Sequence, residues 1–170
     1  APDSELVPLR DASLDFLRGN PSMALPVHWA MVSAAYPFWY NVARQTGRLL
    51  ALQDQVTQAQ ITNRLRELYG DRQTVSRYTR YVIRSFVAWG VLTDSERKGC
   101  YEKTAPFSIV DSQLAILMFE SVLHATPGAK GTLESLLNNP AFFPFQVPVM
   151  TGSLVSQHSA RIEVDRYGLD

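Results

Sequence analysis

Apolar residues recur at steps of three and four through the middle of the chain, a spacing that is typical of amphipathic helices. The longest such stretch predicts a helix over residues 72–90. Its expected inward face consists of Val75, Tyr78, Val82, Phe86 and Trp89. The same periodicity predicts a helix over residues 37–53, and another that begins after Thr57 as N-cap and ends at Gly70.

Two short extended segments follow the 72–90 helix. Residues 91–93 and 100–103 flank a polar, glycine-containing turn at 94–99, which predicts an antiparallel hairpin. A lone hairpin is marginal in water unless it packs against helices. We therefore expect residues 91–104 to form a wing beside the preceding helix.

The flanking segments predict further helices and extended chain. Residues 23–35 and 110–125 are apolar enough for core helices, which could bury each other or supply a homodimer interface. Three prolines interrupt the aromatic segment 140–149, so it is expected to be extended and to cover the core. Apolar and charged residues alternate over 160–165, which predicts a strand.

The composition is that of an ordinary globular protein. The 170 residues are 46% hydrophobic and 19% charged, which predicts one mainly α-helical domain over 1–170. Within it, residues 37–104 form one unit, and segments 1–36 and 105–170 flank it. Pro26 and Pro37 interrupt the apolar stretch near the N-terminus, so no membrane span is expected. Because no secretion signal is evident, we expect a cytoplasmic protein.

Catalytic and metal-binding chemistry has no support in the sequence. One cysteine, Cys100, cannot form an internal disulfide, and three scattered histidines fit no zinc-ligand spacing. No phosphate-binding glycine loop and no nucleophile, base and acid set can be identified. We therefore expect no metal, no cofactor and no enzymatic activity.

Charge is unevenly distributed along a chain whose formal net charge is zero. Residues 44–103 contain eleven basic and six acidic residues, so this segment carries +5 and the remainder −5. Segregated charge can present a cationic face to phosphate even in a neutral protein. The competing interpretation is that the arginines only solvate helix surfaces.

Four short runs carry a resemblance to a known superfamily. They are Thr57-Gln58-Ala59-Gln60-Ile61, Leu68-Tyr69-Gly70, Arg72-Gln73-Thr74-Val75-Ser76-Arg77 and Trp89-Gly90-Val91-Leu92. Two helices joined by a turn and followed by a basic hairpin resemble the winged helix-turn-helix superfamily, in its bacterial DNA-binding form. The expected fold is therefore mainly α, with a winged helix-turn-helix core, a short β-hairpin wing and additional N- and C-terminal helices.

This resemblance implies sequence-specific or structure-specific binding of double-stranded DNA, by a transcriptional regulator or an accessory factor. Helix 72–90 would enter the major groove, which admits one helix, and wing 91–104 would contact the backbone. The expected base-reading residues are Gln73, Ser76, Arg77 and Arg80. The expected phosphate contacts are Arg64, Arg84, Arg97 and Lys98.

Two alternatives stay open at this point. Arg77 and Arg80 could pair with Glu67 or Asp71 on the protein surface. A winged helix could also serve as a protein-interaction module in a larger assembly, such as a bacterial defence system, because a fold does not fix its function. The docking surface would then be the 140–149 strip. Its aromatic residues are Phe142, Phe143 and Phe145.

Overall fold

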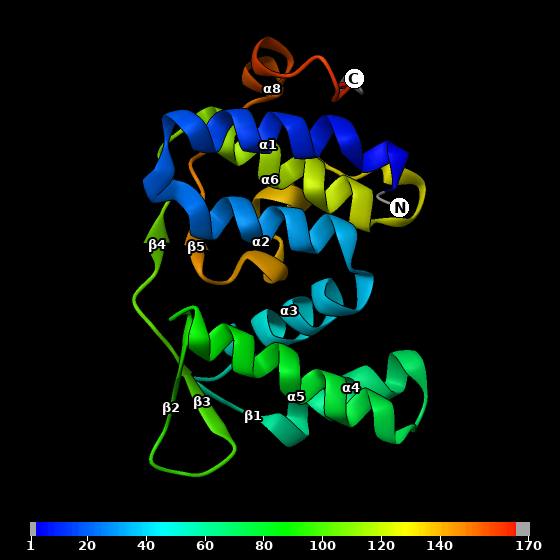
Figure 1. The fold of residues 1–170 in the computed structure, drawn as a ribbon, viewed down its shortest axis with the longest axis vertical. Helices are drawn as coiled ribbons and strands as arrows, with labels where there is room; N and C mark the ends of the chain where they lie inside the picture. The colour runs from blue at the N-terminus through cyan, green and yellow to red at the C-terminus, as the bar shows by residue number, and fades with distance from the viewer. Residues whose placement is uncertain (1–2, 166–170) are drawn as a thin grey trace, which may run out of the picture. The chain divides into compact units, whose positions relative to one another are not determined.

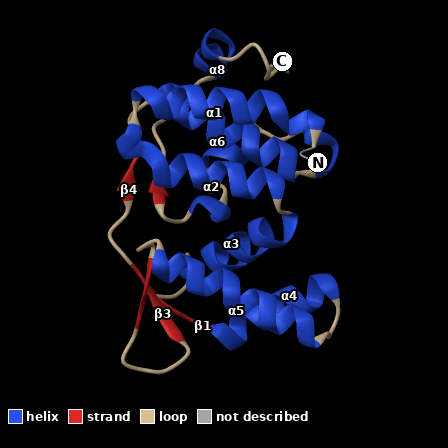
Figure 2. Cartoon of the chain, viewed as in Figure 1, coloured by secondary structure: helices blue, strands red, loops and turns tan. Residues whose placement is uncertain are grey.

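The computed structural model describes residues 3–165, which are mainly helical and include a small three-stranded antiparallel sheet (Figures 1 and 2). These residues form two compact units. The first comprises residues 3–35, 109–137 and 147–165, and the second comprises 36–108 and 138–146. The segment 37–104 therefore lies within the second unit. No helix in the described part of the chain is long and apolar enough to cross a membrane.

The first unit is built on three helices that pack side by side (Figure 1). They are α1 (Val7–Gly19), α2 (Ala24–Ala35) and α6 (Ser112–Ala125). Two shorter helices, α7 (Leu133–Leu137) and α8 (Gly152–His158), pack on α6. The apolar helices α2 and α6 bury much of their surfaces against each other, which is one of the two outcomes expected from their sequences.

The C-terminal part of the first unit differs from expectation. Residues 160–165 form bends and irregular chain after α8, and no strand is assigned there. A strand requires a partner for its backbone N–H and C=O groups. Within its described residues the first unit contains helices and connections only, so it offers no strand with which residues 160–165 could pair. The alternation of apolar and charged side chains alone was not sufficient to form a strand.

This segment is held by an ion pair instead. Arg161 donates from Nε and Nη2 to the two carboxylate oxygens of Glu120, at 2.8 and 3.0 Å. Glu120 is 5% exposed on α6, and the hydrogen bond to it raises the pKa of Arg161. A buried carboxylate is tolerated in a helical core only when it is paired in this way.

The second unit begins with α3 (Pro37–Leu50), β1 (Gln55–Thr57), α4 (Gln58–Tyr69) and α5 (Gln73–Ala88). The hairpin strands β2 (Leu92–Asp94) and β3 (Cys100–Lys103) follow, as expected. Strand β1 was not expected. It pairs antiparallel with β3, with Val56 opposite Tyr101, and gives the sheet order β1-β3-β2. The strand is only three residues long, which is too short for an alternating pattern of apolar and polar residues to indicate it in the sequence.

The aromatic-proline strip forms part of the second unit's core. A short 3-10 helix (Pro140–Phe142) packs on α3, and β5 (Phe145–Gln146) pairs in parallel with β4 (Phe107–Ser108). Phe142 and Phe145 are buried, and the half-buried Phe143 packs edge-to-face on Phe86, with 5.8 Å between centroids. The strip covers the core, as expected. It is not extended throughout, because Pro140–Phe142 form a 3-10 turn, whose first position tolerates a proline.

The contact between α3 and this strip requires glycine at position 47. A Cβ atom built on Gly47 would overlap the carbonyl oxygen of Pro140 and lie 2.6 Å from its carbonyl carbon. Both groups are backbone, so a side-chain rotation cannot relieve the overlap. We expect Gly47→Ala to lower the free energy of unfolding by about 3 kcal/mol, measured by urea denaturation. Gly19→Ala is the control, since nothing lies within 4 Å of its Cβ position, and an equal loss in both variants would show that the contact with Pro140 is not the cause.

The ion pair on α6 gives a second stability test. We expect Arg161→Met to lower the free energy of unfolding by about 2 kcal/mol, because it leaves the Glu120 carboxylate buried and unpaired. The loss is below that of a fully buried pair because Arg161 is itself partly exposed. Arg18→Met removes an exposed pair with Asp15 and should cost less than about 1 kcal/mol. Adding Glu120→Gln to Arg161→Met should restore part of the loss, and no recovery would show that the charge is not its cause.

Candidate nucleic-acid interface

Helix α5 is rotated relative to the expectation from its large apolar residues. Its buried stripe is Val75, Thr79, Ile83 and Phe86. Tyr78 is 52% exposed and Trp89 38% exposed, so the expected inward positions of both were wrong. Val82, also expected to face inward, is only half-buried. Tyr78 contacts Phe38 of α3 edge-to-face at the rim of the core, with 6.4 Å between centroids. Thr79 occupies the buried position, and a pattern of large apolar side chains could not identify it because threonine is commonly counted as polar.

Three of the four expected base-reading residues lie on the exposed side of α5. Gln73, Arg77 and Arg80 are exposed. Neither arginine forms an ion pair with any described residue, although the Arg77 guanidinium lies 5.8 Å from the centroid of the Tyr78 ring. The pairing considered for them with Asp71 is absent, because Asp71 pairs with Arg66 at 3.2 Å.

The fourth, Ser76, lies on a different side of the helix. It is half-buried and lines a groove between α4 and α5, so it does not share the fully exposed face. With about 100° per residue, Ser76 is one step around the helix from Val75 and faces α4. The expectation that Ser76 stands beside Arg77 in one row therefore needs this correction.

Arg84 joins α5 to the hairpin. Its Nη1 donates to Asp94 Oδ1 on β2 at 2.8 Å. The hydrogen bond to Asp94 raises the pKa of Arg84, and a hydrogen bond to Tyr101 raises it further by a smaller amount. Its guanidinium is therefore already engaged, and we assign Arg84 to positioning the hairpin rather than to a free phosphate contact.

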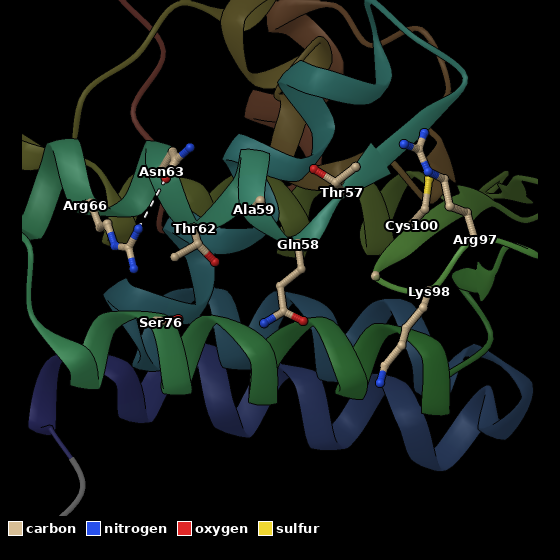
Figure 3. Close-up of a pocket in the computed structure, with 11 residues that line it drawn as sticks. Thr57, Gln58, Ala59, Thr62, Asn63, Arg66, Ser76, Arg97, Lys98 and Cys100 are labelled. Atoms are coloured by element: carbon tan, nitrogen blue, oxygen red, sulfur yellow. Dashed lines mark hydrogen bonds between the residues drawn. The ribbon is translucent and has the colours of Figure 1, made fainter.

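The groove is formed by the start of α4, the hairpin loop and Ser76 (Figure 3), and its volume is about 550 Å³. The exposed side chains of Arg97 and Lys98 come from the loop. Ala59, Thr62, Asn63 and Arg66 line the α4 side. The loop contacts α4 directly, since the backbone N–H of Gln58 donates to the carbonyl of Gly99 at 2.9 Å.

The chemistry of the groove favours an anion. The N-terminus of α4 opens into it, and the positive end of the helix dipole favours negative charge there. The backbone N–H groups of Gln58 and Gln60 are already bonded, to Gly99 and to the Thr57 hydroxyl. Thr62 is 4% exposed, and its hydroxyl has no hydrogen-bond partner among the described residues. Arg66 is held in place by Asn63, to which it donates at 3.4 Å, and by Asp71. Cationic, hydroxyl and amide groups thus line the groove together.

The α4 side of the groove was missed by sequence reasoning, whereas Arg97 and Lys98 were among the expected residues. Residues 59, 62, 63 and 66 are spaced by three and four, so they share one face of α4. That spacing is visible in the sequence as a stripe of small and polar residues. Arg64, expected at a phosphate, does not line this groove. It lies on the other side of α4, because two residues along a helix correspond to about 200°.

No family model, curated protein or solved structure matches this chain. The functional argument therefore depends on the geometry and chemistry of the second unit.

The start of α4, which forms one wall of the groove, depends on a reciprocal cap. The Thr57 hydroxyl accepts from the Gln60 backbone N–H at 3.1 Å, and the Gln60 side chain accepts from the Thr57 N–H at 2.9 Å. We expect Thr57→Ala to lower the free energy of unfolding by about 1 kcal/mol in urea denaturation. Thr57→Ser retains a hydroxyl and should remain close to wild type. Equal stability of the alanine and serine variants would contradict a capping role.

Proposed function

We propose that this protein binds double-stranded DNA through a winged helix-turn-helix in its second unit. Helix α5 would enter the major groove, and the β2–β3 hairpin would lie on the backbone. The observation that carries the proposal is a set of cations without carboxylate partners among the described residues, placed on α5 and on the hairpin loop beside it. These are Arg77, Arg80, Arg97 and Lys98.

The arrangement of elements supports this proposal. Helix α4, a short turn, helix α5 and an antiparallel hairpin follow one another, which is the order on which the resemblance to winged helices rests. Sixteen residues give α5 a length of about 24 Å, and its exposed face offers side chains that suit base edges. Arginine can bond guanine with two hydrogen bonds, and glutamine can do so with adenine. Gln73, Arg77 and Arg80 are therefore the proposed base-reading residues.

The groove supplies the proposed phosphate contacts. A backbone phosphate there would meet the N-terminus of α4, Arg97 and Lys98 on the loop, and the hydroxyl of Ser76. This assigns Ser76 to a phosphate rather than to a base. A protein with this interface could act as a transcriptional regulator or as an accessory factor that recognises a DNA structure.

Docking of a protein through the aromatic-proline strip has less support. Phe142 and Phe145 are buried in the second unit, so their rings would have to leave the core before a partner could contact them. That unpacking would cost several kcal/mol for two aromatic side chains, roughly the cost of truncating them. We therefore do not propose this strip as a docking surface.

The test is binding to a mixed-sequence DNA duplex of about 20 base pairs over a salt series, followed by fluorescence anisotropy. Counterion release makes phosphate binding weaken steeply as salt rises. We expect Arg97→Ala/Lys98→Ala to weaken binding and to reduce the salt slope by roughly 1 to 2, because up to two phosphate contacts are lost. Arg77→Ala/Arg80→Ala should also weaken binding to this duplex, because it removes two positive charges from the proposed interface.

The matched control is Arg10→Ala/Arg18→Ala, which removes the same number of positive charges from exposed positions on α1. This variant should bind as wild type does, since its charges lie outside the proposed interface. Three equally weakened variants would indicate a general charge effect and would contradict the assigned face. A folded wild type that does not bind at low salt would overturn the proposed function.

A further inference from the structure

A second basic cluster lies on the side of α4 that faces away from the groove. Helices α3 and α4 run antiparallel, and two contacts fix their relative position. Gln53 Nε2 donates to Gln60 Oε1 at 2.9 Å, and Asn41 Nδ2 donates to Tyr69 Oη at 2.6 Å. Between these contacts, the turn of α4 that carries Arg64 comes opposite the turn of α3 that carries Arg48.

Arg44 completes the cluster. It precedes Arg48 by four residues, so the two share one face of α3. Arg48 is exposed, and Arg44 and Arg64 are half-buried. Three guanidinium groups from two packed helices are thus held in one region of the second unit.

These charges have no internal compensation. None of the three arginines forms an ion pair with a residue in the described part of the chain, and neither does Glu67, one turn beyond Arg64 on α4. The pKa of Arg48 is lowered, mainly by the nearby charge of Arg44 and further by partial burial and by the charge of Arg64. Tyr40 has the opposite effect and raises this pKa. Like charges that are fixed together without a carboxylate repel one another, and an external anion would remove that repulsion.

We propose that Arg44, Arg48 and Arg64 form a second phosphate-binding site, distinct from the groove between α4 and α5. Guanidinium groups suit this ligand because their fork of N–H donors matches two phosphate oxygens at once. The phosphate is carried either by a nucleic-acid backbone or by a small polyphosphate. The first source rests on the proposed function, whereas the second does not.

The first experiment uses inorganic pyrophosphate as the probe, in calorimetric titration and thermal unfolding against sodium chloride at equal ionic strength. Wild type should bind pyrophosphate and be stabilised by it beyond the effect of the salt. Arg48→Gln should bind about tenfold more weakly, since one charge-assisted contact is lost. Arg48→Lys keeps the charge and should bind with intermediate affinity.

Stability without ligand separates a binding role from a structural one. Arg48→Gln relieves repulsion, so its melting temperature at low salt should equal or exceed that of wild type. Arg10→Ala/Arg18→Ala, on α1 and outside both proposed sites, should bind pyrophosphate as wild type does. Pyrophosphate that stabilises no more than sodium chloride, or that binds Arg48→Gln and Arg64→Gln with wild-type affinity, would overturn the second site.

The DNA duplex distinguishes the two sources of phosphate. If the site binds a backbone, Arg48→Gln will also reduce the salt slope of duplex binding by about 1. If it binds a small polyphosphate, Arg48→Gln will change pyrophosphate binding alone. Failure of the protein to bind any duplex would contradict the proposed function and leave the pyrophosphate result as independent evidence for the cluster.

Discussion

The packing of Phe86 fixes the arrangement of the second unit. Its fully buried ring meets Trp39 of α3 edge-to-face, with 5.4 Å between centroids, and meets Phe143 from the aromatic-proline strip in the same manner. Its carbonyl accepts from the backbone N–H of Val91, where the chain turns toward the hairpin. One residue therefore sets the rotation of α5 and the direction in which the hairpin leaves it. That rotation decides which side chains of α5 are exposed.

The charges of the second unit follow from this arrangement. Arg66 and Arg84 have carboxylate partners, Asp71 in the turn after α4 and Asp94 on β2. The remaining arginines of α3, α4 and α5 have no such partner among the described residues, although acidic residues are present in the same unit. An exposed ion pair contributes only about 0 to 1 kcal/mol, so stability neither requires nor excludes pairing of these arginines. An external anion could therefore bind them without displacing a carboxylate.

Much of the fold could be predicted from the sequence, because helix signals are local. Each helix signal is read from residues that are close together in the chain. Examples are the cap at Thr57, the stop at Gly70 and the apolar spacing of α4 and α6, and the structure contains both helices. The hairpin was predictable for the same reason. Strand β1 was not, because its partner is more than forty residues away and it is only three residues long.

The candidate site was less predictable, because it depends on which face of each helix is buried. Val75 and Phe86 are buried as expected, but Thr79 and Ile83 take the places expected for Tyr78 and Val82. The buried face of α5 is therefore turned toward Ser76, which is half-buried, while Arg77 stays exposed. The sequence also shows one basic segment, 44–103, where the structure contains two basic surfaces. Composition counts charges along the chain and cannot show that Arg64 and Arg66 point to opposite sides of α4.

The separation of these two surfaces constrains how nucleic acid could use both. With its side chains, α4 is about 10 Å across, so a straight duplex on α5 and the groove would leave the cluster at Arg44, Arg48 and Arg64 on the far side of that helix. To contact the cluster, the same duplex would have to bend around α4. Bending a short site costs on the order of 1–6 kcal/mol, which a few charge-assisted phosphate contacts can offset. A bent duplex would therefore be favoured only when the sequence is deformable, and specificity would then arise from DNA shape as well as from base contacts of α5.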